Sequence, residues 1–411
     1  MDYPLQPRTA AGVTFVDLAE HHAVAIAERA AEHDRDATFP VEAFEAMRAS
    51  GFLGATAPAD LGGMGVGSAY DLMVALDRLG RADGSVAIAA HMHLAFGLIG
   101  TRQMNQARQE GDDERADAFA ALLALMAGGG IVMANATEPG TDTAHPLTTL
   151  TPVADGYRLD GRKVFSTLSP VADLFFVLAR GPEEDGIETQ GYAVVGRGAP
   201  GQEIRANWDA LGMRASGSHE IVYDGCPVAA NMWLPVGAWG AHSEQTLVVA
   251  TLGNAGLLGA FLGIAEAARD RVLADVRTRR KPPSDRVIAE RYGIQHQVAE
   301  MEVDVVACRA LLERAGRIID AEVLDRFADI DDLHEANREF QAVKLAAHRH
   351  CIDIVDRAMT ISGGAGYMTA SPLSRHYRDV RAGPFMQPYS PNEAYEYIGK
   401  VALGLDPTIT Q

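Results

Sequence analysis

Hydrophobic residues recur at two different spacings along the chain, and the change of spacing divides the sequence into three zones. From residue 16 to about residue 127 the apolar positions recur every three or four residues, as at Phe44 and Met47, which predicts helices. Between residues 130 and about 239, short alternating runs are separated by Gly, Pro and Asp, a pattern typical of antiparallel strands and hairpins. After residue 243 the helical spacing returns and continues almost to the carboxyl terminus.

This order of elements predicts the domain organisation. Helices followed by strands and then by helices again indicate an α+β fold, because a parallel α/β fold would alternate the two kinds of element. We therefore expect an N-terminal α-helical domain at residues 1–129, a central antiparallel β domain at residues 130–241 and a C-terminal helical domain at residues 242–411. At roughly 100 to 200 residues per domain, a chain of 411 residues accommodates three.

Turn signals locate the elements more closely. A glycine-rich run at residues 61–67 separates two of the expected N-terminal helices. In the central zone, Asp155-Gly156 and Asp160-Gly161 predict hairpin turns, since glycine adopts the positive φ that such turns need. The expected strands with the clearest alternation are residues 148–153, 157–159, 174–178 and 192–195.

Composition and charge narrow the classes of partner. The chain is 47% hydrophobic and 22% charged, which is enough apolar material for a sizeable core. Its 36 basic residues against 55 acidic ones give a formal net charge of -19, which argues against a nucleic acid or an anionic membrane surface as partner. The most apolar stretch, residues 247–268, is interrupted by glycines and polar residues, so we expect a buried helix there and no membrane span.

The cysteines indicate a reducing environment. Cys226, Cys308 and Cys351 are too far apart in sequence for a metal-binding pair, and their odd number fits no disulfide framework. The first residues also lack the basic region and apolar run of a secretory signal. We therefore expect a cytoplasmic protein without a metal site.

Several short motifs occur in order over nearly the whole chain. They are Gly51-Phe52-Leu53, Pro58 with Leu61-Gly62-Gly63, Thr137-Glu138-Pro139-Gly140, Gly161-Arg162-Lys163 with Phe165 and Thr167, Ser362-Gly363-Gly364-Ala365-Gly366-Tyr367 and Arg378-Asp379. Each motif is weak alone, but together and at compatible spacing they resemble the acyl-CoA dehydrogenase family. The resemblance implies a C-terminal four-helix bundle, one FAD per subunit between the last two domains, and a homodimer or homotetramer.

The resemblance also implies which residues contact the flavin. Thr137 and Thr143 match positions that bond the flavin and its pyrophosphate, and Phe165-Ser166-Thr167 matches a segment along the isoalloxazine edge. The positions that match contacts to the FAD of a neighbouring subunit are Arg279, Thr360, Gly363 and Gly364. Hydroxyls, a guanidinium and glycines suit a pyrophosphate, but an ordinary turn and a solvated run of charge would contain the same residue types. The Phe-Gly that follows the arginine in the family is replaced by Pro282-Pro283.

The catalytic base of the family is missing. Family members remove an α proton from an acyl thioester with a glutamate, and this requires an ionised carboxylate near the substrate. At the usual position this chain has Gln387, whose amide is not a base, and at the alternative position it has Gly253. Glu244, nine residues before Gly253, would reach the pocket only through an irregular insertion. Glu393 is a weak candidate for the base, because a glutamate at a helix start is ordinarily solvated.

These departures are similar to a branch of the same superfamily that uses reduced flavin and oxygen to oxidise its substrate. Phe165-Ser166-Thr167 and the proline-containing segment at residues 387–391 match that branch, for which the cofactor would be FMN and the lack of a glutamate would be no defect. His91 lies near the position where the branch uses a histidine. As histidines among Ala, Met and Leu, both His91 and His93 also suit a helical core.

Three classes of function follow from these observations. The leading prediction is an FAD-dependent oxidoreductase that oxidises an acyl thioester with hydride transfer to flavin N5. The alternative is a two-component flavin-dependent monooxygenase or oxidase that uses reduced flavin and O2. The third class is a partner subunit that has lost its chemistry, because a fold alone does not establish activity.

Overall fold

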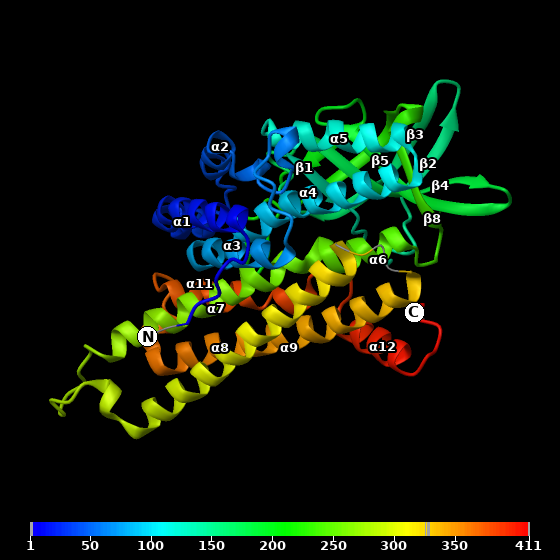
Figure 1. Ribbon diagram of the computed structural model, residues 1–411. Helices are drawn as coiled ribbons and strands as arrows, with labels where there is room; N and C mark the ends of the chain where they lie inside the picture. Colours follow the sequence, from blue (N-terminus) through cyan, green and yellow to red (C-terminus); the bar gives the residue numbers. More distant parts are fainter. Residues whose placement is uncertain (1–2, 325, 327–328, 410–411) are drawn as a thin grey trace.

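The computed structural model describes residues 3–324, 326 and 329–409, and it places helices at both ends of the chain and a sheet between them (Figure 1). The N-terminal helices are α1 (Ala10–Asp36), α2 (Val41–Ala49), α3 (Ala69–Ala82), α4 (Gly84–Glu110) and α5 (Asp113–Ala127). The type of element changes between residues 127 and 132 and again between residues 238 and 244. The predicted order of helices, sheet and helices is confirmed.

Side-chain caps fix the starts of three helices that will matter below. Asp83 accepts a hydrogen bond from the Ser85 amide at 2.7 Å and begins α4. Asp112 accepts one from the Arg115 amide at 3.0 Å and begins α5. Ser243 begins α6 (Glu244–Thr251) with a capping box. Each cap satisfies amide groups that the first turn leaves without a partner, so the sequence sets where these helices begin.

The central sheet is mixed, and the expectation of a purely antiparallel sheet is wrong. Its strands are β1 (Val132–Asn135), β2 (Thr149–Val153), β3 (Gly156–Ser166), β4 (Leu174–Glu184), β5 (Ile187–Gly196), β6 (Gln202–Arg205), β7 (His219–Val228) and β8 (Trp233–Ala238). They run in the order β6-β7-β3-β2-β4-β5-β8, and β1 and β2 both pair with β4 in parallel. Alternating side chains have the same period in parallel and antiparallel strands, so the sequence pattern did not reveal these directions.

One of the two predicted turns is also wrong. Asp155-Gly156 does form the β2–β3 hairpin, in which Val153 pairs with Gly156. Asp160-Gly161, however, lies inside β3, where the register with β7 shifts between Leu159 and Gly161. An Asp-Gly pair serves a bulge as readily as a turn, because glycine tolerates the irregular backbone at both.

The C-terminal part is a set of long helices packed side by side (Figure 1). They are α6, α7 (Ala255–Val276), α8 (Tyr292–Ile318), α9 (Ile330–Ser362), α10 (Gly364–Tyr367), α11 (Pro372–Val380) and α12 (Pro391–Ala402). Two stretches, Gly84–Glu110 and Glu244–Thr278, are long and apolar enough to span a membrane, but 78% and 89% of their apolar windows are buried inside the protein. They are core helices, as predicted for residues 247–268.

Glycines let α7 pack directly against the backbone of α3. A Cβ atom at Gly259 would overlap the carbonyl oxygen of Met73, and one at Gly263 would overlap that of Asp77. On the opposite helix, a Cβ atom at Gly80 would overlap the carbonyl oxygen of Ala260. This contact places the start of α7, and the irregular turn before it, against α4.

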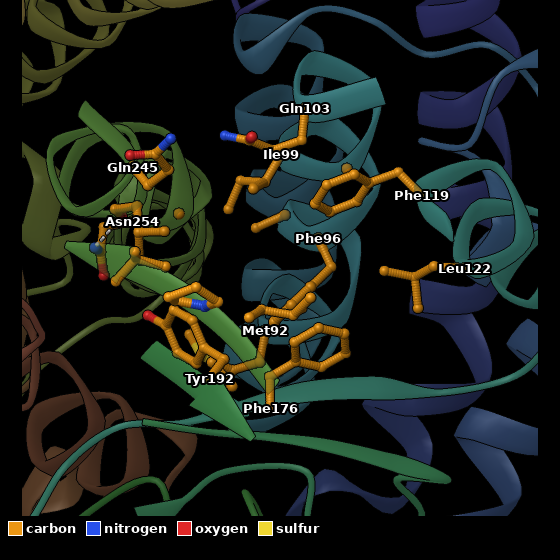
Figure 2. Close-up of a pocket in the computed structure, with 18 of the residues that line it drawn as sticks. Met92, Phe96, Ile99, Gln103, Phe119, Leu122, Phe176, Tyr192, Gln245 and Asn254 are labelled. Carbon is orange, nitrogen blue, oxygen red and sulfur yellow. Dashed lines mark hydrogen bonds between the residues drawn. The ribbon is translucent and has the colours of Figure 1, made fainter. Parts of the chain in front are cut away.

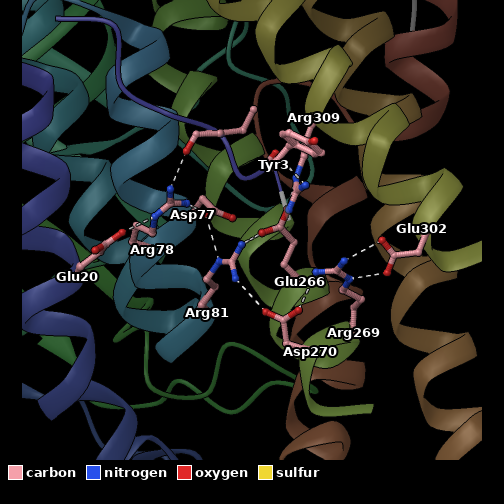
Figure 3. A network of polar contacts seen from close by, with 11 residues as sticks. Tyr3, Glu20, Asp77, Arg78, Arg81, Glu266, Arg269, Asp270, Glu302 and Arg309 are labelled. Carbon is pink, nitrogen blue, oxygen red and sulfur yellow. Dashed lines mark hydrogen bonds and ion pairs between the residues drawn. The ribbon is translucent and has the colours of Figure 1, made fainter. Parts of the chain in front are cut away.

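Buried ion pairs tie the N-terminal segment to the same helices (Figure 3). Arg81 on α3 pairs with Asp77 and with Glu266 on α7, and both carboxylates are almost completely buried. Arg309 on α8 pairs with Glu266 at 2.8 Å and donates to the carbonyl of Tyr3 at 2.9 Å. A buried charge without its partner is strongly destabilising, so these pairs lock the relative positions of α3, α7 and α8.

Candidate functional site

A cavity of about 400 Å³ lies between α4, α5, the sheet and the α6–α7 junction (Figure 2). Its apolar walls include Met92, Phe96, Phe119, Leu122 and Phe176. The polar side chains on its surface are Gln103, Arg115, Tyr192, Gln245, Asn254 and Gln387. Among the described residues that line the cavity there is no aspartate and no glutamate. The cavity therefore has hydrogen-bonding groups but no carboxylate base.

Gln387 reaches this cavity from the segment that connects the 3-10 turn Gly383–Phe385 to α12. Its side-chain amide donates a hydrogen bond to the hydroxyl of Thr137, which lies just after β1. The structure thus brings together two predicted site residues that are 250 positions apart in the chain. Gln387 occupies the position predicted for the family base and makes an amide contact there.

A buried lysine holds the segment that carries Gln387. The Lys344 ammonium on α9 donates to the carbonyl oxygens of Met386, Gln387 and Tyr389, the last two at 3.1 Å. Burial lowers the pKa of Lys344 to about 7, and the nearby Glu393 charge acts in the opposite direction. Sequence reasoning missed this residue, because its only signal is a lysine on the apolar stripe of an amphipathic helix.

A second buried ion pair shapes the turn that contains Thr137. Glu138 pairs with Lys163 on β3 and accepts hydrogen bonds from the amides of Leu147 and Thr148 at 2.8 and 3.0 Å. Burial alone would raise the pKa of Glu138, but the charge and hydrogen bond of Lys163 lower it overall. Burial lowers the pKa of Lys163 to about 8, partly offset by Glu138. The pair anchors the 137–140 turn from inside the domain and leaves its outer edge free.

The segment Phe165-Ser166-Thr167 forms the end of β3. The Ser166 hydroxyl donates to the side-chain oxygen of Asn135 at 2.9 Å, and the Thr167 hydroxyl lies 2.8 Å from that of Ser218. Phe165 has a positive φ of 53°, and 59% of its surface is exposed. The ring packs edge-on against Trp208, with 5.7 Å between the ring centroids, and leaves apolar surface exposed.

The two predicted histidines are core residues, and neither side chain lines the cavity in the described structure. His93 donates to the Leu53 carbonyl at 2.9 Å and accepts from the Val132 amide at 3.1 Å, so both ring nitrogens are used. His91 Nε2 donates to the Gly253 carbonyl at 2.9 Å, while its buried Nδ1 has no partner. Burial lowers the pKa of each to about 4, so both are neutral near pH 7.

The two glutamates considered as substitutes for the missing base have structural contacts. Glu393 accepts a hydrogen bond from the Ser390 amide at 2.6 Å in the capping box of α12. Glu244 pairs with Arg102 on α4 at 2.7 Å. Neither lines the cavity, so the wall has no carboxylate from either candidate.

Comparison with known proteins identifies the fold family. The chain matches the models of the acyl-CoA dehydrogenase N-terminal domain over residues 16–108, the middle domain over residues 131–226 and the C-terminal domain over residues 255–386. The chain belongs to the acyl-CoA dehydrogenase family. It is accordingly a flavin-dependent oxidoreductase whose cofactor is FAD or FMN, and the prediction at this level is confirmed.

Individual relatives narrow the comparison within this family. The amino sugar nitrososynthase DnmZ of Streptomyces peucetius is 37% identical over 97% of this chain and 95% of its own length. The L-evernosamine nitrososynthase of a Micromonospora strain is 39% identical over 97% of this chain and 92% of its own. The structure of KijD3 in complex with FMN and a dTDP-linked 3-amino-4-keto sugar superimposes with a TM-score of 0.90 at 37% identity, covering 98% and 96% of the two chains. These relatives favour the oxygen-using alternative over the predicted oxidation of an acyl thioester.

The residues predicted to reach a neighbouring subunit's flavin form a second group at the ends of α7 and α9. Arg279 donates to the carbonyls of Ile361 and Ser362, both at 3.2 Å, and pairs with Asp275 at 2.9 Å. Thr360 is exposed, and nothing lies within 4 Å of where a Cβ would stand at Gly363 or Gly364. Among the described residues no hydrogen bond or ion pair joins this group to the group around Thr137, so the two groups are separate within one chain.

The group around Thr137 fits a flavin. Gly140 has a positive φ of 78° and open space in place of a side chain, and the Thr143 hydroxyl makes no hydrogen bond to the described residues. Together with Thr137 and the exposed Phe165 ring, these features offer hydroxyl donors, accessible backbone and an apolar edge beside the cavity. Their assignment as flavin contacts remains a prediction.

Proposed function

We propose that this chain is a flavin-dependent N-oxygenase that oxidises the primary amine of a nucleotide-linked amino sugar, with FMN as its flavin. The observation that carries the proposal is the cavity wall, which presents amides, a phenol and a guanidinium but no carboxylate among the described residues. The substrate class is supported by the similarity to proteins named as amino sugar nitrososynthases and to a complex that contains FMN and a dTDP-linked amino sugar.

The missing carboxylate argues against oxidation of an acyl thioester. Removal of an α proton needs a base with a pKa well above that of an amide, and the Gln387 amide at the base position neither accepts a proton nor carries charge. Amine oxidation has no such requirement, because the amine nitrogen supplies its own electron pair. The cavity wall that lacks the base for oxidation of an acyl thioester is therefore sufficient for oxidation of an amine.

The proposed reaction balances as two successive oxygenations. In the first, R–NH2, O2 and a reduced flavin give R–NHOH, water and oxidised flavin. In the second, R–NHOH, O2 and another reduced flavin give R–N=O, two water molecules and oxidised flavin. Bound reduced flavin supplies the electrons that activate dioxygen for transfer of one oxygen atom.

The residues of this chain would orient the amine and exclude water. Asn254 donates its side-chain NH2 to the carbonyls of Val249 and Ala250 at 3.2 and 3.3 Å, which leaves its oxygen as an acceptor for an amine N–H. Burial raises the pKa of Tyr192 to about 12, so its phenol stays neutral and offers one donor and one acceptor. Figure 2 shows Tyr192 and Asn254 on the same side of the cavity, opposite the aromatic wall formed by Phe119 and its neighbours.

FMN is the proposed flavin because the similar KijD3 complex contains FMN. The replacement of the family's Phe-Gly by Pro282-Pro283 after Arg279 also supports it, since that segment would meet the adenosine half of FAD. Thr137, Phe165 and Thr167 would hold the flavin ring beside the cavity. A homo-oligomer stays a prediction, since the group at Gly363 would reach such a flavin only from another copy.

The test is a single-turnover oxidation with isotopically labelled O2. The purified chain is loaded with photoreduced FMN, mixed with a thymidine-diphosphate-linked 3-amino sugar and labelled O2, and the product is analysed by mass spectrometry. We expect a hydroxylamine and then a nitroso product that carry the label. An unlabelled product, or no product from any amino sugar in a panel, would refute the proposal.

A second arm tests the acyl thioester reaction directly. The chain loaded with oxidised flavin is titrated with short and long acyl-CoAs without oxygen, in the parent and in Gln387→Glu. We expect no bleaching of the flavin in either protein. Bleaching by the parent chain would restore the dehydrogenase prediction, and bleaching by Gln387→Glu alone would show that an acyl-CoA still fits and that only the base has been lost.

A further inference from the structure

We propose that Arg115, with the side-chain amides of Gln103 and Gln245, forms an anion-binding subsite at one end of the cavity and receives the diphosphate of the nucleotide-linked sugar. The identity of the anion rests on the proposed function. The subsite itself rests on hydrogen-bonding groups that the protein leaves without partners.

Arg115 is held in place with donors to spare. It lies in the first turn of α5, where its backbone amide donates to the capping Asp112, and its Nη1 pairs with Glu110 at 3.0 Å. Its Nε and Nη2 are buried and have no hydrogen-bond partner. It is also the one charged side chain among the described residues that line the cavity. Buried guanidinium donors without acceptors are costly, so the site is prepared for an acceptor that the protein does not provide.

Two side-chain amides line the same cavity as Arg115. Gln103 on α4 is 6% exposed, lines the cavity and makes no side-chain hydrogen bond within the described part of the chain. Figure 2 shows the amide groups of Gln103 and Gln245 facing the cavity from its two sides, at the end remote from Phe176. Each NH2 group offers two donors, and phosphate oxygens are acceptors only.

Arg102 on α4 differs from Arg115 in the hydrogen bonds of its guanidinium. Arg102, one turn before Gln106 on α4, donates to the Val323 carbonyl at 2.8 Å, to Gln106 at 3.1 Å and to Glu244 at 2.7 Å. It could bind a ligand only by breaking these contacts. Arg102 therefore joins α4, α6 and the segment after α8, whereas the guanidinium of Arg115 still has free donors.

The position of the subsite gives the substrate a direction. Gln387 lines the cavity and contacts Thr137 of the proposed flavin group, whereas Arg115 reaches the cavity from the first turn of α5 and Gln103 from α4. In a 3-amino sugar linked to a diphosphate, the amine and the anion are on different ring carbons, so different parts of the cavity would bind them. A guanidinium bonds phosphate oxygens through two parallel N–H groups, and the positive end of a helix N-terminus adds to the attraction.

The charge balance of the chain makes this cation decisive. The net charge is -19, and Asp113 and Glu114 beside Arg115 are acidic but exposed, where water screens them. Arg115 is the charged side chain on the described cavity wall, and its buried Nε and Nη2 are the donors that an anion in the cavity would meet.

The experiment measures binding of thymidine diphosphate by calorimetry to the FMN-loaded chain and to three variants. We expect Arg115→Ala to weaken binding about 10-fold to 100-fold, the effect of losing a charge-assisted hydrogen bond. Arg115→Lys should retain part of the affinity because it keeps the charge without the fork geometry. Arg108→Ala, which removes an equal charge from an exposed position in the last turn of α4, is the matched control and should bind as tightly as the parent.

A second readout separates this subsite from the proposed function. For a nucleotide-linked amino sugar, Arg115→Ala should raise KM in proportion to the lost affinity and leave kcat within about twofold, whereas oxidation of the free amino sugar should not change. If thymidine diphosphate binds the parent and Arg115→Ala equally well, the subsite is refuted even when the chain oxidises amines. If the variant loses affinity but no amine is oxidised, the subsite stands and the N-oxygenase proposal fails. Unchanged FMN affinity and unfolding temperature exclude misfolding as the cause.

Discussion

Replacing Lys344 with methionine tests whether a residue that does not itself line the cavity controls the cavity's shape. The ammonium satisfies three carbonyls of the segment that carries Gln387, and methionine fills a similar volume without any donor. Each hydrogen bond to a charged group contributes roughly 1.5–3 kcal/mol, but the substitution also removes the cost of burying the charge. We therefore expect a net destabilisation of about 2–4 kcal/mol, which for a chain of this size lowers the unfolding temperature by roughly 2–5 °C.

The functional consequence should exceed the loss of stability. Without Lys344 the segment at residues 386–389 is free to move, and the Gln387 amide no longer holds Thr137 at the edge of the proposed flavin site. The assay compares FMN affinity by fluorescence quenching and KM for the amino sugar, at a temperature well below the unfolding transition. We expect both to worsen about tenfold in Lys344→Met, to be partly rescued in Lys344→Arg, and to stay unchanged in the exposed control Lys281→Met. Wild-type FMN affinity and KM in a destabilised Lys344→Met would refute a positioning role.

Three further predictions concern the scaffold. Burial raises the pKa of Asp379 to about 7, so between about pH 4 and pH 7 the unfolded chain loses a proton that the folded chain keeps. The free energy of unfolding should therefore fall as the pH rises through this window, by at most about 1.4 kcal/mol per pH unit. Asp379→Asn should flatten the pH profile of the unfolding temperature. Gly259→Ala should lower the unfolding temperature markedly, because the new methyl group overlaps the Met73 carbonyl; an unchanged transition would show that α7 does not pack this closely. Glu138→Gln should lower the free energy of unfolding by about 3–5 kcal/mol and weaken FMN binding, because it leaves the buried Lys163 unpaired. The double variant with Lys163→Met should recover stability. A double variant as unstable as Glu138→Gln alone would contradict the ion-pair argument.

The sequence predicts those parts of the fold that depend on neighbours along the chain. Helical spacing and the Asp155-Gly156 turn act over a few residues, and the structure has helices and a hairpin where they indicate them. Strand direction depends on partners that are distant in sequence. The parallel pairing of β1 with β4 joins Val132 to Leu174, and no local pattern encodes that choice. For the same reason Asp160-Gly161 looks like a turn and is a bulge.

The candidate site also contains some residues that the sequence predicts and others that only the three-dimensional structure reveals. The resemblance to a family predicts a flavin contact for Thr137 and the position of the catalytic base for Gln387, and the structure joins the two side chains by a hydrogen bond that no spacing pattern indicates. Lys344, Arg115 and Gln103 belong to no motif quoted above, and their importance appears only from partners in space. Lys344 has three carbonyls to satisfy, whereas Arg115 and Gln103 have donors without acceptors. An unsatisfied group is a property of the packed structure, so no sequence pattern could reveal it.

The absence of a carboxylate from the described cavity wall also determines the protonation state of the proposed substrate. An amine must be neutral to use its electron pair, yet a primary amine in water near pH 7 is largely protonated. A wall with an aspartate or glutamate would hold the ammonium form and suppress the reaction. A wall of aromatic rings with the neutral groups of Asn254, Tyr192 and Gln387 disfavours the charged form and lowers the pKa of the bound amine. A cavity without the family glutamate therefore lacks the base that oxidation of an acyl thioester needs. It also lacks the counterion that would keep an amine substrate protonated and unreactive.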